Sequence, residues 1–166
     1  MPTKLITILL AFCALSASAF LLSQPSFPTL SEQLVLQRID GQQQQLGDMK
    51  GMPLLITFWS PSCVPCMQEV KQLNQLYTQL EGGRKFELLA LSMVYDRPDQ
   101  VIQSSAHARM QYPVYLDLSN ELSRAFGNIV ATPALFLLNS DGDITYQHSG
   151  KSDFTLISQK LKKLIG

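Results

Sequence analysis

Two cysteines separated by two residues carry the clearest chemistry in this sequence. Cys63 and Cys66 follow a long apolar run, and a helical residue pattern begins between them. Two thiols at this spacing on a first helical turn can close a disulfide with little movement of the backbone. The N–H groups and positive dipole end of the helix stabilise a thiolate at Cys63, lowering its pKa from about 8.5 to roughly 3.5–7.5. This predicts dithiol–disulfide exchange, with Cys63 as the nucleophile and Cys66 as the shielded thiol that resolves a mixed disulfide.

The segments on either side of this pair indicate an α/β domain. Residues 53–59 (PLLITFW) and 86–93 are nearly continuous apolar runs, as expected for strands buried on both faces. Between them, apolar residues recur at three- and four-residue intervals over residues 64–80, which predicts an amphipathic helix. Strand, helix and strand make a βαβ unit with a parallel pair, and the cysteines lie where the first strand meets the helix.

The rest of the chain supplies further short elements. Leu34, Leu36 and Ile39 form a strand-like run, and Asp40-Gly41 between it and the glutamines 42–45 predicts an N-terminal β-hairpin. A second hairpin turn is expected at residues 140–143. The remaining expected elements are helices at about 98–110, 120–126 and 154–165 and strands at 114–116, 134–139 and 144–148.

Composition and charge exclude some classes of protein. The chain has 166 residues, with 13 Lys+Arg against 13 Asp+Glu and 46% hydrophobic side chains. This length suits one domain with a sizeable core, and the apolar content is too high for a disordered chain. Phosphate-driven affinity needs clustered Lys and Arg, whereas the charges here are dispersed. The sequence therefore argues against a nucleic-acid binder.

The first 22 residues have the layout of an export signal. Lys4 precedes an uncharged apolar run over residues 5–22, and Ala17-Ser18-Ala19 offers a cleavage site before Phe20. Because a span needs roughly 17–25 apolar residues, the same run is long enough to stay as a membrane anchor. Residues 1–22 are therefore interpreted as a signal peptide or an N-terminal anchor.

The export signal also fixes how the remaining residues are interpreted. Cys13 lies inside the apolar run and is interpreted as a small hydrophobic residue rather than a lipid-attachment site. Residues 23–31 are Pro- and Ser-rich and are expected to form a spacer, followed by a folded domain at residues 32–166. That domain is expected to be periplasmic or otherwise extracytoplasmic, either free or anchored in the inner membrane.

Several motifs beyond the Cys pair resemble one family. The chain is similar to the TlpA/ResA/CcmG group of exported thiol–disulfide oxidoreductases over about residues 30–166. The motifs that carry this resemblance are ITFWSPSCVPC, the lead-in IDGQQQQLGDMKG, Glu69, the inserted helix near residues 98–110 and Ala131-Thr132-Pro133. It implies a thioredoxin-like α/β fold, with a central mixed sheet flanked by helices, an N-terminal β-hairpin and an inserted helix.

The same resemblance implies an activity and its partners. It favours an enzyme that reduces protein disulfides, for example to keep apocytochrome c cysteines free for haem attachment. A membrane thiol reductant of the DsbD/CcdA type would then restore the dithiol. No cofactor and no metal are expected, and nothing in the sequence demands more than a monomer.

The resemblance further assigns roles to individual residues. The Thr132–Pro133 bond is expected to be cis, with Pro133 packed against the disulfide and the preceding backbone pairing with a substrate peptide. Thr132 and Pro133, together with Trp59 and Pro65, make up the expected substrate-binding residues.

Glu69 is the candidate proton acceptor. It lies one helical turn beyond Cys66, so a half-buried carboxylate there can take the Cys66 proton as that sulfur attacks. The alternative is an ordinary glutamate on an exposed helix surface. Two positions depart from thioredoxin itself, since Thr57 replaces a buried acid and Ser62 replaces the tryptophan before the first cysteine. These departures leave the substrate and the redox potential open.

Other functions remain as alternatives. The Cys pair would be a static disulfide in a protein-binding module, or it would serve an oxidase or isomerase with the same residues. Zinc needs two further ligands, and the sequence has no second CxxC and no HxxxH motif. His107 and His148 are interpreted as surface or edge residues, whereas a copper-relay protein would need a partnered His and a wider Cys spacing. A peroxiredoxin would need a Thr ahead of a single peroxidatic Cys, and Thr57 is too far upstream.

Overall fold

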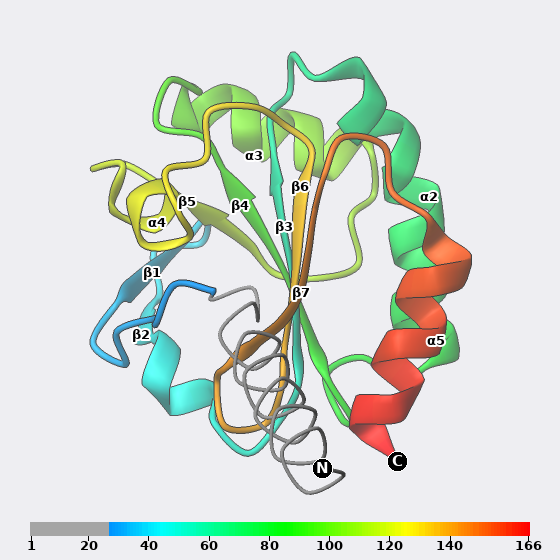
Figure 1. Ribbon diagram of the computed structural model, residues 1–166. Coiled ribbons are helices and arrows are strands. Elements are labelled where there is room, and N and C mark those ends of the chain that lie inside the picture. Colours follow the sequence, from blue (N-terminus) through cyan, green and yellow to red (C-terminus); the bar gives the residue numbers. More distant parts are fainter. Residues whose placement is uncertain (1–26) are drawn as a thin grey trace, which may run out of the picture.

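A computed structural model describes residues 27–166, which form a mixed seven-stranded sheet with helices on both faces (Figure 1). The strands lie in the order β2-β1-β5-β4-β3-β6-β7. They are β1 (Val35–Arg38), β2 (Gln43–Gln45), β3 (Leu54–Trp59), β4 (Glu87–Ser92), β5 (Val114–Leu116), β6 (Ala134–Leu138) and β7 (Ile144–Ser149). The helices are η1 (Leu46–Met49), α2 (Val64–Gln79), α3 (Pro98–His107), α4 (Glu121–Ala125) and α5 (Phe154–Ile165).

The central strand β3 positions the site, because Cys63 follows its carboxyl end. All six residues of β3 are buried. The strand pairs in parallel with β4, from Leu54↔Glu87 to Trp59↔Ser92, and antiparallel with β6 on its other side. A strand with a neighbour on each side and helices on both faces needs apolar residues throughout, which explains the continuous apolar run.

Alternate side chains of β3 divide the core into two layers. Ile56 and Phe58 pack on the face covered by η1 and α4. Leu55 and Trp59 pack on the opposite face with side chains of α2, α3 and α5. Figure 1 shows α2 and α5 side by side along that face. The alternation follows from the two-residue period of a strand, and it directs Trp59 toward the helix that carries both cysteines.

The expected elements are confirmed, with shifts of a few residues at their ends. The N-terminal hairpin forms as predicted, since β1 and β2 pair antiparallel and Gly41 takes a φ of 91° in the turn. The inserted helix ends at His107 rather than near residue 110. Arg109 has a φ of 53°, a left-handed conformation that cannot continue a right-handed helix.

The structure describes only part of the N-terminal region for which predictions were made. Residues 1–26, which include the predicted signal or anchor and the start of the spacer, lie outside the described residues. At the end of the predicted spacer, Phe27 and Leu30 pack against the core layer that contains Phe58. Within residues 27–166, no helix has both the length and the apolar character required to cross a bilayer.

Candidate active site

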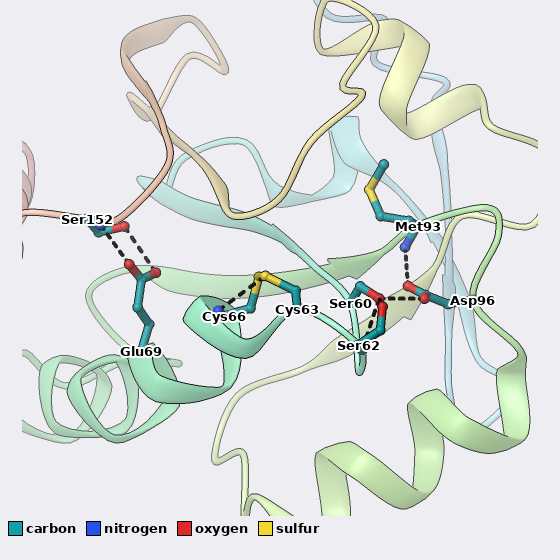
Figure 2. Close-up of a disulfide and its surroundings, with 8 residues drawn as sticks. All are labelled: Ser60, Ser62, Cys63, Cys66, Glu69, Met93, Asp96 and Ser152. Atoms are coloured by element: carbon teal, nitrogen blue, oxygen red, sulfur yellow. Dashed lines mark hydrogen bonds between the residues drawn. A yellow bond between two sulfur atoms is a disulfide. The ribbon is translucent and has the colours of Figure 1, made fainter.

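Cys63 and Cys66 are joined by a disulfide at the start of α2, with their Cα atoms 5.3 Å apart (Figure 2). Cys63 is the N-cap of α2 and has extended backbone angles. Pro65 lies in the first turn, where a missing N–H costs little because that group would have no helical partner. The two sulfurs therefore lie at the junction of β3 and α2, as the sequence predicts.

The two cysteines differ in their access to solvent and in their electrostatics. Cys66 is 4% exposed, whereas Cys63 is half-buried. The backbone N–H of Cys66 donates to Cys63 Sγ over 3.2 Å. After reduction, this N–H and the positive end of α2 favour a thiolate on Cys63. The more accessible sulfur is thus also the one that the helix prepares as a nucleophile.

A serine–aspartate network holds the loop before Cys63 (Figure 2). Ser60 Oγ–H donates to Asp96 Oδ1 (2.6 Å), and Asp96 Oδ2 accepts the Met93 N–H (3.0 Å). Because the Ser60 hydroxyl hydrogen is used in this bond, Ser62 is the donor in the 2.9 Å contact between the two serine hydroxyls. Asp96 therefore ties the loop after β4 to the loop that leads into Cys63.

Sequence reasoning missed this network, although one signal was available. Ser60 follows β3 directly, and Asp96 comes four residues after the end of β4. Since β3 and β4 are parallel neighbours, their carboxyl ends meet at the same sheet edge. Polar residues just beyond two such strands are therefore expected to lie close together.

Glu69 is buried, so the alternative of an exposed surface glutamate is wrong. Its side chain is 3% exposed. Ser152 donates twice to it, from the backbone N–H to Oε1 (2.6 Å) and from the hydroxyl to Oε2 (3.1 Å) (Figure 2). Glu69 and Cys66 also line one small cavity. The helical spacing indicated this proximity to Cys66, but nothing local in the sequence indicated Ser152.

The other residues named for substrate binding differ in accessibility. The Thr132–Pro133 peptide bond is cis, as expected. Pro133 is buried, and its carbonyl accepts the Gly150 N–H (2.8 Å), while Thr132 is half-buried. Pro65 is exposed. Trp59 is 2% exposed and packs in the same cluster as Cys66; its part in substrate binding stays a prediction.

No side-chain cluster within residues 27–166 has the composition of a metal site, since no group of three or more His, Cys, Asp or Glu gathers there. His107 is exposed. His148 lies on the edge strand β7, where Nε2 is 2.9 Å from the Lys151 carbonyl oxygen. What the described site offers is two sulfurs, one buried carboxylate and a polar network, a set that suits thiol–disulfide exchange.

Curated proteins with similar sequences carry out this chemistry. The chain is 27% identical over 131 residues to the thiol-disulfide oxidoreductase ResA of Bacillus thuringiensis subsp. konkukian, a match that covers 78% of this chain and 73% of that protein. It is also 27% identical over 123 residues to the sporulation thiol-disulfide oxidoreductase A of Bacillus subtilis. That match covers 73% of this chain and 71% of the relative.

Solved structures show the same fold. StoA from Bacillus subtilis superposes with a TM-score of 0.65 at 23% identity, covering 81% of this chain and 98% of that one. A thiol:disulfide interchange protein from Chlorobium tepidum superposes with a TM-score of 0.72 at 21% identity, covering 86% and 100%. The model of the Redoxin family matches residues 23–164. The chain therefore belongs to the Redoxin family, as a TlpA/ResA-like thiol–disulfide oxidoreductase of the thioredoxin superfamily.

Proposed function

We propose that this chain is an exported reductase of protein disulfides, with Cys63 as the nucleophile and Cys66 as the resolving thiol. The observation that carries the proposal is the asymmetry of the pair at the start of α2. Cys63 is the more accessible and receives the Cys66 N–H, whereas Cys66 is buried. A static disulfide has no need of this difference between its two sulfurs.

The reaction transfers two electrons from the dithiol to the substrate. The Cys63 thiolate attacks one sulfur of the substrate disulfide, and the other sulfur leaves as a thiolate that takes up a proton. Cys66 then loses its proton and attacks Cys63 Sγ. This step forms the Cys63–Cys66 disulfide and releases the second substrate thiolate, which is protonated in turn. The form shown in Figure 2 is thus the oxidised product of the cycle.

Glu69 accepts the proton that Cys66 gives up. Its carboxylate is buried one helical turn beyond Cys66 and lines the same cavity. The two bonds from Ser152 hold the carboxylate in place while leaving it free lone pairs, since a carboxylate offers about four acceptor positions. A positioned base that takes a proton during the attack speeds such a step by about 10²–10⁴-fold.

The surface around Cys63 suits an extended polypeptide. Thr132, Pro133 and Pro65 present the substrate-binding edge, where backbone pairing with a peptide is available. Exposed apolar side chains lie at the same sheet edge, namely Val64 in the first turn of α2, Tyr95 in the loop after β4 and the 80% exposed Val130 in the loop before β6. Apolar surface of this kind favours an unfolded or partly folded protein substrate over a small charged disulfide.

The cellular setting of the proposal comes from the N-terminus and from the relatives. The apolar residues 5–22 act as a signal or an inner-membrane anchor, and the domain works outside the cytoplasm. That compartment is oxidising, so a dedicated reductant is useful there, for example for apocytochrome c cysteines. A membrane thiol reductant of the DsbD/CcdA type, itself a dithiol, supplies the electrons that regenerate Cys63 and Cys66. The chain acts as a monomer.

Trapping with Cys66→Ser tests the activity. The variant retains the nucleophile but lacks the resolving thiol, so mixed disulfides with substrate proteins should accumulate at Cys63. The matched control is Cys63→Ser, which should trap none. If both variants behave alike, and both thiols of the reduced wild type show ordinary pKa values in an alkylation titration, the pair is a static disulfide in a binding module.

The redox potential tests the direction. Proteins with a CxxC pair span about −270 to −120 mV. A value near the reducing end supports a reductase, and a value near the oxidising end assigns the same residues to an oxidase or isomerase.

A further inference from the structure

An open groove lies between α2 and the segment that follows α3. The volume of this α2 groove is about 620 Å³, within the range of roughly 300–1,000 Å³ that ligand-binding sites occupy. Its lining includes four side chains of α2 and two from the segment after α3, namely Met67, Lys71, Asn74 and Thr78, with Arg109 and Gln111. The described site has no use for this groove in the exchange reaction itself.

One side chain of α2 fixes the opposite wall of the groove. Asn74 Nδ2 donates to the Arg109 carbonyl oxygen (2.9 Å), and Asn74 Oδ1 accepts the Gln111 N–H (3.0 Å). Arg109 has a φ of 53°, which is an unfavourable conformation for a residue with a Cβ atom. The two bonds from Asn74 hold this backbone in place, so the position of Arg109 at the groove is built into the fold.

The α2 groove carries positive charge. Lys71 and Arg109 are both exposed, and none of the described residues that line the groove is Asp or Glu. The ion pairs found within residues 27–166 join other residues. Lys71 lies one helical turn before Asn74, which binds the backbone of Arg109. Two cations therefore lie close together without a carboxylate between them, which suits an anionic partner.

The groove also continues from the reactive cysteine. Cys63, Met67, Lys71, Asn74 and Thr78 follow one another at three- or four-residue intervals, a spacing that places side chains on one face of a helix. The Met67 N–H donates to the Cys63 carbonyl oxygen over 3.1 Å. A protein joined to Cys63 by a mixed disulfide is thus next to the start of the groove.

The size of the groove favours a peptide segment over a small anion. A single exposed ion pair contributes little to binding, so several contacts along the groove are needed. Lys71 is eight positions beyond Cys63, or about 12 Å along a helix. An extended chain covers that distance in about four residues. A carboxylate about four residues from a partner's reactive cysteine therefore reaches Lys71.

We propose that the α2 groove binds an acidic segment of the protein whose disulfide reacts with Cys63. Lys71 and Arg109 pair with carboxylates of that segment and are specificity-determining residues. The proposal rests on the function proposed above and adds the class of substrate, a polypeptide with Asp or Glu about four residues from the cysteine that is attacked.

Two matched peptides test this preference. Each is used as the symmetric disulfide of a peptide with one cysteine, so attack on either sulfur gives the same products. One peptide has Glu four residues before and four residues after the cysteine, and the other has Gln at both positions. The preference is the ratio of the two second-order rate constants for oxidation of the reduced chain. Glu also alters the reactivity of its own peptide, so this ratio is compared between protein variants.

Neutralising the two cations should remove the preference. We expect the ratio to be about fivefold higher in the wild type than in the double variant Lys71→Gln, Arg109→Gln, as for the loss of two exposed ion pairs. The matched control is Lys162→Gln, Lys163→Gln, which removes two exposed cations of α5 outside the groove. The control should keep the wild-type ratio. Equal ratios in both double variants would overturn the proposal.

Salt provides a test on the unmodified chain, which is independent of how the variants fold. Pairs between exposed charges are screened at about 1 M salt, where the Debye length is roughly 3 Å. The preference of the wild type should fall to that of the Lys71→Gln, Arg109→Gln variant. A preference that is insensitive to salt would refute pairing with these cations.

Cross-linking tests where the partner lies. Cys66→Ser is first joined to the Glu peptide through Cys63, and a carbodiimide then links carboxylates to amines that touch them. We expect the peptide on Lys71 in preference to Lys162 and Lys163. Equal linkage to all three lysines contradicts the proposal. It is also contradicted if the Lys71→Gln, Arg109→Gln variant loses binding to vesicles that contain phosphatidylglycerol but keeps the peptide preference, because the groove then faces a lipid surface.

The outcomes separate this proposal from the function on which it rests. If Cys66→Ser traps substrate proteins but the peptide preference is the same in both double variants, the groove proposal fails and the reductase stands. If Cys66→Ser traps nothing, the reductase itself fails.

Discussion

Replacing Glu69 with glutamine tests whether this buried carboxylate moves a proton or only supports the fold. Glutamine has nearly the same shape, and its amide oxygen can still accept the Ser152 N–H that now lies 2.6 Å from Oε1. The second contact, from the Ser152 hydroxyl to Oε2, reverses direction, because an amide NH2 donates to the hydroxyl oxygen. The variant should therefore keep the local structure and lose the base.

The expected loss of stability is small. A hydrogen bond to a charged group contributes about 1.5–3 kcal/mol, and one between neutral groups contributes about 0.5–1.5 kcal/mol. Two weakened bonds are partly offset, because the variant no longer buries a charge. We expect Glu69→Gln to change the free energy of unfolding by less than about 2 kcal/mol.

The expected kinetic effect is larger and confined to one step. Loss of general-base catalysis slows a proton-coupled step by about 10²–10⁴-fold, and a hundredfold loss corresponds to about 2.7 kcal/mol on the barrier. Attack by Cys63 on the substrate does not involve Glu69 and should keep its rate. The Gln variant should thus accumulate the mixed disulfide that Cys66 normally resolves.

A single-turnover experiment measures both steps. Reduced protein is mixed with a disulfide-containing peptide, quenched in acid and alkylated, and the mixed disulfide is separated from the products. Cys66→Ser marks the position of the trapped species. Glu69→Ala is the structural comparison, because it leaves the Ser152 N–H unpaired and should destabilise the fold more than Gln does. If the Gln variant resolves at the wild-type rate while only the Ala variant is impaired, Glu69 is a structural residue and the reasoning above is refuted.

Three further predictions follow from contacts around the site and in the core. Asp96→Asn replaces one of the two oxygens that accept hydrogen bonds from Ser60 and Met93, so the loop before Cys63 should be held less firmly. Denaturant titration should show that the free energy of unfolding falls by about 1–3 kcal/mol. Gly82→Ala places a Cβ 2.0 Å from the ring of Tyr77. This overpacking should lower the free energy of unfolding, measured in urea, by about 1–3 kcal/mol. The thiol chemistry of the folded fraction should not change. Burial raises the pKa of Tyr115 to about 12, so the folded chain keeps a proton that the unfolded chain releases above pH of about 10. Denaturation midpoints should therefore fall as pH rises from about 10 to 12, and Tyr115→Phe should flatten that decline.

The parts of this protein that a sequence predicts well are those specified by neighbouring residues. The buried strand β3 is visible as an apolar run because every one of its residues is buried. The Cys pair could be placed between this strand and a helix because the helical residue pattern starts directly after Cys63. The end of α3 was missed because Arg109 takes a left-handed backbone that no local pattern signals. Residue types indicate where helices and strands form, whereas the backbone angles at their ends depend on the direction of the segment that follows.

The partners of the site residues were missed for a different reason, since they lie far away in the sequence. Ser152 is 83 positions from Glu69, and Asp96 is 36 from Ser60. Periodicity states which face of an element is buried, but it does not state which polar group will meet that face. This limit matters most for Glu69, because a glutamate between apolar positions of α2 is tolerable inside only if another segment supplies donors.

The segment that supplies those donors also contacts the proposed peptide-binding edge. Residues 150–153 connect β7 to α5, and Gly150 donates its N–H to the Pro133 carbonyl (2.8 Å) while Ser152 donates to Glu69. One short loop therefore holds both the strand entry next to the proposed peptide-binding edge and the proposed proton acceptor. Because the two bonds lie two residues apart, any shift of this loop displaces both. Sequence motifs identify Pro133 and Glu69 separately, and only the packing of α5 beside α2 shows that a single connection orients them together.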